Sequence, residues 1–466
     1  MHMEERRVPM MEPFRIRAVE PIPILTRAER RAALEAAGYN VFNLRSADVT
    51  IDLLSDSGTG ATSIQQEAAA MVADEAYAGS RSWYRFVEEI EDLTGYPHIL
   101  PVHQGRAGER ILDAALLGPG KISISNTHFD TTAANVMLTG AEARNLPCPE
   151  AADLDSDQPF KGNIDLDALA RTLSGPDGSR VALVLMTITN NGGGGQPVSM
   201  ANMEAAKELC ARHGIPFILD AARFGENAWL VKQREPGYER FTPREIARRA
   251  FDLADGTVVS LKKDGAGWGG GFIGLRDDAL ATQCEANLIA TEGFSTYGGM
   301  TGHDLSRLAE GVREMVDPFY LAYRADAADH LATRVREAGV DTVRPSGLHG
   351  IYLNAGRLLS HLPPQRFPGH TLACQLYLDG GVRCSELGSL YLGELNDRNE
   401  VVTPAPYELV RLALPRRVYT QSHLEYVADV LAGIAAKPES LEGYRITHAP
   451  PVLRHFKVRL APYGAA

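Results

Sequence analysis

The sequence predicts an α/β protein in which a mainly parallel central sheet forms a large domain and a smaller α+β domain follows. Short apolar runs alternate with helical patterns between about residues 60 and 280, as in parallel sheets covered by helices. The chain has 466 residues, more than one hydrophobic core usually fills. We therefore expect an N-terminal arm over residues 1–56, a large domain over 57–310 and a small domain over 311–466, with the arm packed on the small domain.

The arm and the large domain contain most of the expected elements. Thr26 and Glu29 form a capping box at the start of the first helix, and Gly38 ends that helix. Ser199 is expected to cap a later helix, which Gly214 ends. The expected helices span residues 27–37, 65–76, 109–117 and 200–213. The expected strands span residues 49–54, 99–102, 122–125, 181–186, 216–220, 257–260 and 271–275.

The small domain shows a different pattern. One long helical stretch opens it, and shorter strand and helix patterns follow before an irregular tail. The expected helices span residues 305–335, 371–378 and 422–436, and the expected strands span residues 342–344, 350–354 and 409–414. Because strict alternation is lost here, the pattern indicates an α+β unit rather than a continuation of the parallel sheet.

Composition and charge exclude several classes of partner. Lysine and arginine number 47 against 59 acidic residues, so the net charge of −12 argues against nucleic acid or an anionic membrane surface. No apolar run is long enough to cross a bilayer, and the N-terminus lacks an apolar signal core. Five scattered cysteines without a CxxC pair indicate a reduced, cytoplasmic protein with neither a disulfide framework nor a zinc site.

Two adjacent lysines, Lys262 and Lys263, lie between the apolar strands 257–260 and 271–275. A buried ammonium loses its hydration, so such a pair needs a physical reason. A lysine in a low-dielectric site forms a Schiff base with an aldehyde, and pyridoxal 5′-phosphate (PLP) is the usual aldehyde. A surface hairpin with solvated lysines fits this stretch equally well when it is taken alone.

Polar residues follow several expected strands, at the sheet edge where ligands bind in such folds. Asp220 ends a buried strand, and a carboxylate there would keep the PLP ring nitrogen protonated. Capping a following helix is the alternative role for Asp220. Gln104 and Arg106 stand at a strand-to-helix junction, which suits a phosphate. The polar residues expected at this edge are Gln104, Asp130, Asn191, Asp220 and Lys263.

Eight longer runs, spread in one order over almost the whole chain, carry a family resemblance. They are Glu12-Pro-Phe-Arg-Ile16, Ala37-Gly-Tyr-Asn40, Asp52-Leu-Leu-Ser-Asp-Ser-Gly-Thr59, Asp74-Glu-Ala-Tyr-Ala-Gly-Ser80, His103-Gln-Gly-Arg106, Gly194-Gly-Gln-Pro-Val-Ser-Met-Ala-Asn202, Lys262-Lys-Asp264 and Pro415-Arg-Arg-Val-Tyr-Thr420. In these runs the chain resembles the aromatic amino-acid β-lyases, the family of tryptophanase and tyrosine phenol-lyase. The resemblance implies the fold type I architecture of PLP-dependent transferases, a homotetramer built as a dimer of dimers, and a monovalent cation, K⁺, near the active site.

The resemblance implies a cofactor site at the carboxyl edge of the sheet. Lys263 would bind PLP covalently and later move the substrate α-proton, and Asp220 would pair with the ring nitrogen. The side chains expected around the ring oxygen and the ring face are Arg223, Asn191 and Phe129. The residues expected around the phosphate are Gln104, Gly105, Arg106, Ser260 and Lys262, the last through water.

The resemblance also implies a substrate site and a cation site. Arg411 would clamp the substrate α-carboxylate in a planar, bidentate geometry. The residues that would assist Arg411 are Ser55, Ser57 and Asn191. Tyr77 would be the acid that protonates the leaving carbon. The cation would be bound by the carbonyl oxygen of Gly58, by Glu75 and by the carbonyl oxygen of Trp268.

Three positions decide which leaving group the site would accept. Where the phenol-lyases carry Thr, Arg and Phe, this sequence has Asp130, Leu387 and His455, which is closer to the tryptophanase pattern. An aspartate accepts a hydrogen bond from the indole N–H, and a leucine supplies no charge for a phenolate. The expected reaction is therefore that of L-tryptophan with water to give indole, pyruvate and ammonia. For His455 taken alone, a tail histidine packed on the surface is the alternative.

Other interpretations stay open from the sequence. The loop 265–271 is richer in glycine than in the family, Trp268 replaces a smaller residue beside the cation, and His303 stands where an arginine is expected. These differences leave the cation and the substrate open, so a β-lyase for tyrosine or for an S-substituted cysteine is the runner-up. A catalytically inactive PLP-fold binding protein is the remote alternative, against which Lys263, Asp220 and Arg411 argue.

Overall fold

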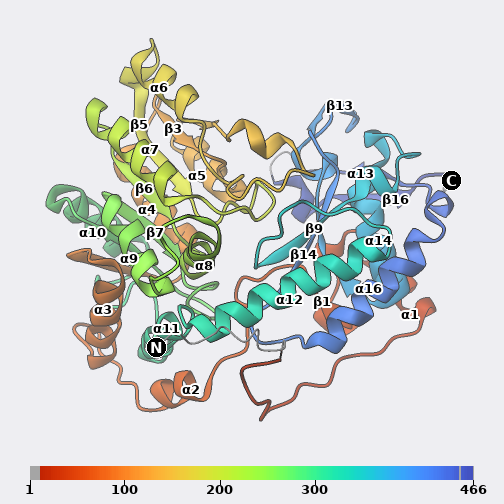
Figure 1. The fold of residues 1–466 in the computed structure, drawn as a ribbon, viewed down its shortest axis with the longest axis horizontal. Coiled ribbons are helices and arrows are strands. Elements are labelled where there is room, and N and C mark those ends of the chain that lie inside the picture. Colours follow the sequence, from red (N-terminus) through yellow and green to blue (C-terminus); the bar gives the residue numbers. More distant parts are fainter. Residues whose placement is uncertain (1–10, 451–452, 465–466) are drawn as a thin grey trace.

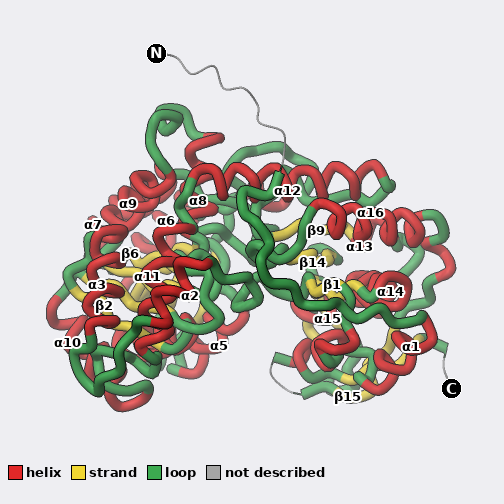
Figure 2. Tube along the Cα trace, turned by 90° about the horizontal axis from the view of Figure 1, so that it is seen from below, coloured by secondary structure: helices red, strands yellow, loops and turns green. Residues whose placement is uncertain are grey.

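The computed structural model describes residues 11–450 and 453–464, which form two adjoining bodies (Figure 1). One body is built on a seven-stranded sheet and the other on a three-stranded sheet. The long helix α12 (Pro318–Glu337) extends from the first body to the second. Loops fill much of the junction between them (Figure 2), and the polar residues discussed below meet at this junction.

The seven-stranded sheet is parallel except for one strand. Its order is β2, β8, β7, β6, β5, β3 and β4. Strand β8 (Gly271–Leu275) runs antiparallel to both of its neighbours, and all other pairings are parallel. The other strands are β2 (His98–Val102), β3 (Ile122–Ser125), β4 (Glu142–Asn145), β5 (Val181–Thr187), β6 (Phe217–Asp220) and β7 (Gly256–Ser260). The expected mainly parallel sheet is confirmed.

Helices cover both faces of this sheet because successive strand side chains point to opposite sides. Ile218 and Val258 belong to a core beneath α4 (Gly105–Leu116) and α10 (Asp278–Thr291). Leu219 and Val259, one residue further along each strand, belong to a larger core on the opposite face. The helices that contribute to this larger core are α3 (Arg81–Thr94), α6 (Leu166–Ser174), α7 (Met200–His213), α8 (Phe224–Arg234), α9 (Pro243–Leu253) and α11 (Gly302–Glu314).

The second body surrounds an antiparallel sheet with the order β11, β14, β9. The N-terminal arm lies on this body, because β1 pairs in parallel with β10 and α1 packs on α14. Its strands are β1 (Ile51–Asp52), β9 (Gly350–Asn354), β10 (Val382–Arg383), β11 (Ser385–Leu387), β12 (Glu394–Leu395), β13 (Val401–Thr403), β14 (Leu409–Ala413), β15 (Tyr444–His448) and β16 (Arg459–Pro462). Its helices are α1 (Arg27–Ala36), α13 (Ala355–Leu358), α14 (Pro368–Gly380), α15 (Ser389–Leu392) and α16 (Gln421–Ala435).

Several local expectations were wrong. The helical stretch 305–335 is two helices, because Asp317 caps a new helix and Pro318 stands at its first position, where its missing N–H costs nothing. The helix expected over 65–76 is α2 (Ile64–Met71), and the strand expected over 49–54 is only the short β1. The sequence did not predict α3 or α5 (Asp130–Leu138), and the tail expected to be irregular contains the β15–β16 pair.

No helix within the described residues is long and apolar enough to span a bilayer. The longest, α12, packs on α8 of the first body and on α16 of the second. A small apolar cluster that includes Leu230, Met315 and Leu321 lies where α12 leaves the first body. Helix α12 therefore packs against the cores of both bodies.

Candidate active site

Lys263 lies in the turn between β7 and β8, at the carboxyl edge of the sheet. Burial and the nearby Arg223 guanidinium lower the pKa of Lys263 to about 8, while Asp56, Asp220 and Glu109 partly oppose them. Its amine makes no hydrogen bond to another described residue. Such an amine loses its proton readily and is free to attack a carbonyl. The solvated-hairpin interpretation of the lysine pair is therefore wrong for Lys263.

Asp220 ends β6, the strand next to β7. It is not a helix cap, because α8 begins after Arg223 and has no side-chain cap. Burial raises the pKa of Asp220, and the positive charges of Lys263 and Arg223 oppose that rise. Thr187 Oγ lies 3.5 Å from the carboxylate. Its local hydrogen-bond donors are Thr187 and the backbone N–H of Ala222, which leaves acceptor capacity on the carboxylate for a protonated ring nitrogen.

Glu109 is a half-buried carboxyl on α4 that sequence reasoning did not single out. Burial and the charge of Asp220 raise the pKa of Glu109 to about 7. Thr132 Oγ and Asn135 Nδ2, both on α5, donate to it at 3.0 and 3.2 Å. Glu109 holds a proton up to about neutral pH. Of the neighbouring carboxyls Glu109 and Asp220, only Asp220 therefore needs to be charged.

The first turn of α4 provides a cradle for an anion. Helix α4 begins at Gly105, and Gln104 precedes it without any side-chain cap, so the first N–H groups are not satisfied by a side chain. A Cβ on Gly105 would lie 2.5 Å from the Cβ of Ser260, so only glycine permits this close approach of α4 to β7. Burial and the positive charge of Arg106 lower the pKa of Lys262. Arg106 and Lys262 are thus two cations near this helix start. This donor set fits a phosphate.

Arg411 lies in the middle of β14, and its guanidinium reaches across to the first body. Its Nη1 donates to Asn191 Oδ1 at 2.8 Å, and its Nη2 donates to the carbonyl oxygen of Leu54 at 3.0 Å. Arg411 Nε is buried and has no partner among the described residues. A buried guanidinium N–H without an acceptor is costly, so the site suits an anionic ligand such as a carboxylate.

Asn191 is held in turn by the second body. Its side-chain oxygen accepts a hydrogen bond from Tyr352 OH at 2.9 Å and lies 3.2 Å from His349 Nε2. Ser55 and Ser57 flank Asp56 close by, with Ser57 N donating to Ser55 Oγ. Burial and the charge of Arg223 lower the pKa of His349 to about 4, so this imidazole is neutral near pH 7.

A buried network of alternating charges underlies the site. Arg416 is central, because it donates to Asp56 at 3.0 Å, to Glu226 at 2.9 Å and to Asp264 at 2.6 Å. Arg223 makes two hydrogen bonds to Asp56, at 2.8 and 3.0 Å. The network is completed by Arg324, which donates to Glu226 at 2.7 Å. Three guanidinium groups thus balance three carboxylates.

Sequence reasoning did not find this network. It expected Arg223 beside the cofactor ring oxygen and gave no sign of the two hydrogen bonds that Arg223 makes to Asp56. The runs 262–264 and 415–420 contained Asp264 and Arg416, but no pattern in either run assigned these residues a partner. Their pairing depends on the contact of the loop after β14 with α8, which local periodicity does not encode.

Asp130 and His455 come together from opposite ends of the chain. Asp130 opens α5 directly after Phe129, and its Oδ2 lies 3.3 Å from His455 Nε2. His455 is buried, and its ring packs against Phe456 at a centroid distance of 3.9 Å and against Tyr391 at 4.2 Å. The alternative of a surface tail histidine is therefore wrong.

The residues expected to donate a proton or bind a cation do not all meet at one place in this chain. Tyr77 is 74% exposed between α2 and α3, and its ring stacks on Phe294. Glu75 Oε1 accepts a hydrogen bond from Gly302 N at 2.9 Å, at the start of α11. Gly58 and the Trp268 carbonyl are close, since a Cβ on Gly58 would lie 3.1 Å from that oxygen. The described residues contain no cluster of three or more acidic, histidine or cysteine ligands for a metal.

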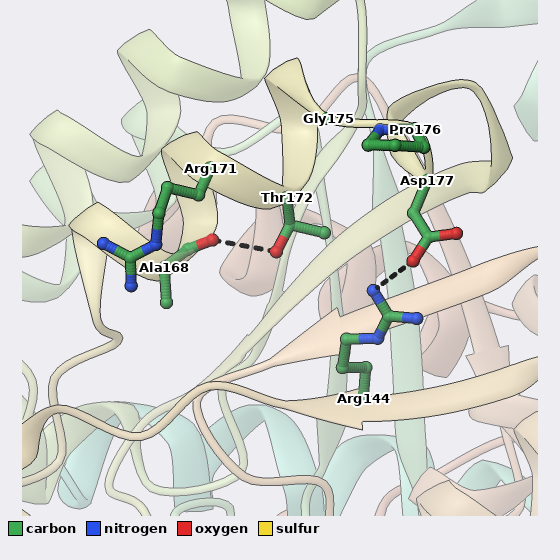
Figure 3. A pocket seen from close by; sticks show the side chains of 7 residues that line it. All are labelled: Arg144, Ala168, Arg171, Thr172, Gly175, Pro176 and Asp177. Atoms are coloured by element: carbon green, nitrogen blue, oxygen red, sulfur yellow. Dashed lines mark hydrogen bonds and ion pairs between the residues drawn. The ribbon is translucent and has the colours of Figure 1, made fainter.

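A surface hollow of about 260 Å³ lies elsewhere, beside the edge strand β4 (Figure 3). Arg144 and Asp177 in its wall form an ion pair at 2.9 Å, and Arg171 points away from them. Three strands separate β4 from β7 in the sheet. The hollow contains none of the residues expected to act on a substrate.

Two buried carboxyl groups, Glu386 and Glu408, flank Gly388. A Cβ on Gly388 would lie 2.2 Å from an oxygen of Glu408 and 2.8 Å from an oxygen of Glu386, so glycine is required here. Gly388 N donates to Glu386 at 2.6 Å, and Ser389 N donates to Glu408 at 3.0 Å. Burial and the charge of Glu408 raise the pKa of Glu386 well above 4.5, and burial raises that of Glu408.

Replacing Glu386 with glutamine is expected to flatten the pH dependence of stability. A carboxyl whose pKa is raised by folding keeps a proton that the unfolded chain releases, so its contribution to stability is present below pH 4.5 and is lost as the pH rises through the raised value. Urea midpoints from pH 5 to 9 should therefore fall more for the wild type than for Glu386→Gln. The control is Glu394→Gln on exposed β12. Parallel curves for wild type and Glu386→Gln would contradict the assignment.

Comparison with known proteins gives one consistent result. The model of the "Beta-eliminating lyase" family matches residues 52–430. The chain is 48% identical over 447 residues to a tryptophanase of Hyphomonas neptunium, covering 96% of this chain and 98% of that one. It is 49% identical over 453 residues to a tryptophanase of Salinibacter ruber, with 97% and 96% covered. A tyrosine phenol-lyase of Intrasporangium calvum is 42% identical over 454 residues, with 97% and 96% covered.

Solved structures agree on the fold. The chain superposes with a TM-score of 0.61 on Bna3p, titled a putative kynurenine aminotransferase, from Saccharomyces cerevisiae, at 14% identity over 89% of this chain and all of the other. An aspartate aminotransferase from Thermus thermophilus gives a TM-score of 0.58 at 16% identity, covering 89% of this chain and 97% of that one. At such low identity these similarities concern the fold alone.

Proposed function

The chain belongs to the β-eliminating lyase family, and on that premise we propose that it cleaves L-tryptophan with water to indole, pyruvate and ammonia. One observation carries the choice of substrate: Asp130 and His455 meet at 3.3 Å, so that a carboxylate acceptor is available to a ring N–H. Leu387, on β11, places no charge where a phenolate would need one. The names of the most similar relatives support the same substrate.

The residues at the sheet edge fit PLP as the cofactor. When bound, PLP supplies an aldehyde for a lysine and a ring that withdraws electrons from the substrate α-carbon. We expect Lys263 to attach it, Asp220 to hold the proton on its ring nitrogen and Phe129 to cover its face. Arg223 and Asn191 would be near the ring oxygen. The residues expected to hold its phosphate are Gln104, Gly105, Arg106, Ser260 and Lys262.

Side chains of this chain would bind the substrate, remove its α-proton and hold the leaving ring. Arg411, with its buried unpaired Nε, binds the substrate carboxylate, assisted by Asn191 and the serines at 55 and 57. Lys263, with a pKa of about 8, takes the α-proton as a neutral amine near pH 8. Asp130 and His455 hold the indole N–H while the leaving carbon is protonated. Water then supplies the oxygen of pyruvate.

A second copy of the chain completes the proposed site. Tyr77 is exposed, and its ring contacts Phe294 and Tyr297, so we assign the proton donor for the leaving carbon to Tyr77 of a neighbouring copy. A K⁺ ion between the Gly58 and Trp268 carbonyls of one copy and Glu75 of another would link the two. We propose a homotetramer, built as a dimer of dimers, that acts in the cytoplasm.

A substrate panel tests the proposed reaction. Pyruvate release from tryptophan should exceed that from tyrosine by about 10⁴-fold in kcat/KM, because the wrong ring leaves the Asp130 acceptor unpaired. Asp130→Ala should lose about 10²-fold or more on tryptophan. The same variant should stay within a few fold of wild type on an S-alkylcysteine, whose leaving group needs no carbon protonation.

The same panel contains the outcomes that would contradict the proposal. Tyrosine cleaved faster than tryptophan by the wild type would favour the runner-up, a lyase for another β-substituted amino acid. Equal loss on all substrates in Asp130→Ala would assign Asp130 a structural role. An absence of pyruvate from every substrate would favour a binding protein without catalysis.

A further inference from the structure

Tyr391 contacts both residues that are expected to bind the leaving ring. Its ring centroid lies 4.2 Å from that of His455, at an interplanar angle of 55°. Burial, the charge of Asp130 and a hydrogen bond to Asp130 raise the pKa of the Tyr391 phenol. The phenol therefore stays protonated beside the Asp130 carboxylate. No motif in the sequence had singled out Tyr391.

Tyr391 is itself held firmly. It belongs to the short helix α15, whose first N–H groups are bound by the buried carboxyls of Glu386 and Glu408. Arg454, the neighbour of His455 in sequence, donates from Nε to the carbonyl oxygen of Leu390 at 2.7 Å. The segment that carries Tyr391 is thus hydrogen-bonded to the segment that carries His455, beside Asp130.

The hydrogen bonds of Asp130 leave limited room for a ligand. Its Oδ1 accepts a hydrogen bond from Thr131 N at 2.6 Å, and its Oδ2 faces His455 Nε2 at 3.3 Å. The Tyr391 phenol also lies beside this carboxylate, which has about four acceptor positions. At least one acceptor position of Asp130 therefore remains for a ligand.

We infer that Tyr391 is a positioning and specificity-determining residue for the leaving group. Its hydroxyl orients Asp130 and its ring supports His455, so that the remaining acceptor position faces an N–H on a flat, bicyclic leaving ring. This inference rests on the proposed function and deepens it. A leaving group without an N–H, such as an alkyl thiolate, should not need Tyr391.

The test compares Tyr391→Phe, which removes only the hydroxyl, with Tyr426→Phe as a matched control on exposed α16, where the hydroxyl donates to Gly380. For Tyr391→Phe, kcat/KM on tryptophan should fall by about 10- to 100-fold, the span expected for a hydrogen bond to a charged group. Activity on an S-alkylcysteine should stay within about two-fold. Binding of indole to the holoenzyme, followed by calorimetry, should weaken in parallel. Tyr426→Phe should change neither quantity.

The outcomes separate this inference from the proposed function. If the wild type cleaves tryptophan and Tyr391→Phe matches it in kcat/KM and indole affinity, the inference is overturned and the function stands. Equal losses on tryptophan and the S-alkylcysteine would also overturn it, because a merely structural role predicts that result. If the wild type does not cleave tryptophan, the proposed function is wrong, whatever Tyr391→Phe shows. Tyr391→Leu, which removes the ring as well, should lose more indole affinity than Tyr391→Phe.

Discussion

Replacing Lys263 with alanine is expected to remove both the covalent attachment of the cofactor and turnover. Loss of pyruvate release should reach at least about 10⁴-fold, the upper part of the range that one positioned proton-transfer group supplies. The reason is structural, since Lys263 is the amine at the carboxyl edge whose pKa is lowered to about 8. The measurements are the visible absorption of the purified protein and the protein mass after borohydride reduction in the presence of PLP.

The adjacent lysine is the control. Lys262 lies one residue away and is also partly buried, with Arg106 nearby, but it is expected near the phosphate rather than at the reacting carbon. Lys262→Ala should therefore keep the borohydride-fixed mass while binding PLP more weakly. If Lys263→Ala retained that fixed mass and Lys262→Ala lost it, the two lysines would have been assigned in reverse.

Replacing Arg416 with methionine is expected to be the most destabilising change outside the reacting residues. Arg416 is fully buried and holds three carboxylates at 2.6 to 3.0 Å. Its removal leaves uncompensated negative charge in the interior, a change that costs about 3–5 kcal/mol. The measurement is the urea midpoint of the intact protein.

Two further variants separate charge from packing. Arg313→Met removes an arginine that is 60% exposed and paired with Glu89 and Glu310, so its effect should stay within about 1 kcal/mol. Adding Asp264→Asn to Arg416→Met restores charge balance and should recover part of the loss. If the double variant were no more stable than Arg416→Met, packing rather than charge would explain the effect.

The sequence alone predicted much of the fold. Apolar runs such as those around Ile218 and Val258 specify buried strands through local composition, and helices such as α7 carry their own start and stop signals in Ser199 and Gly214. The carboxyl edge followed from the alternation of strand and helix patterns, which indicates a mainly parallel sheet. Lys263 and Asp220 were therefore predicted before any contact was known, because Asp220 ends one buried strand and Lys263 lies in the turn after another.

Tertiary structure decided the rest. The Asp130–His455 contact joins opposite ends of the chain, and the Arg416 network joins residues from both bodies, so no local pattern could pair them. Buried charges are stable only with partners, and which partners they have depends on how the two bodies pack. Tyr391 shows the same limit, since a tyrosine in a short helix becomes important only because Arg454 and two buried carboxyls hold it beside Asp130. Local sequence determined which segments form strands and helices, whereas long-range packing determined which side chains share a site.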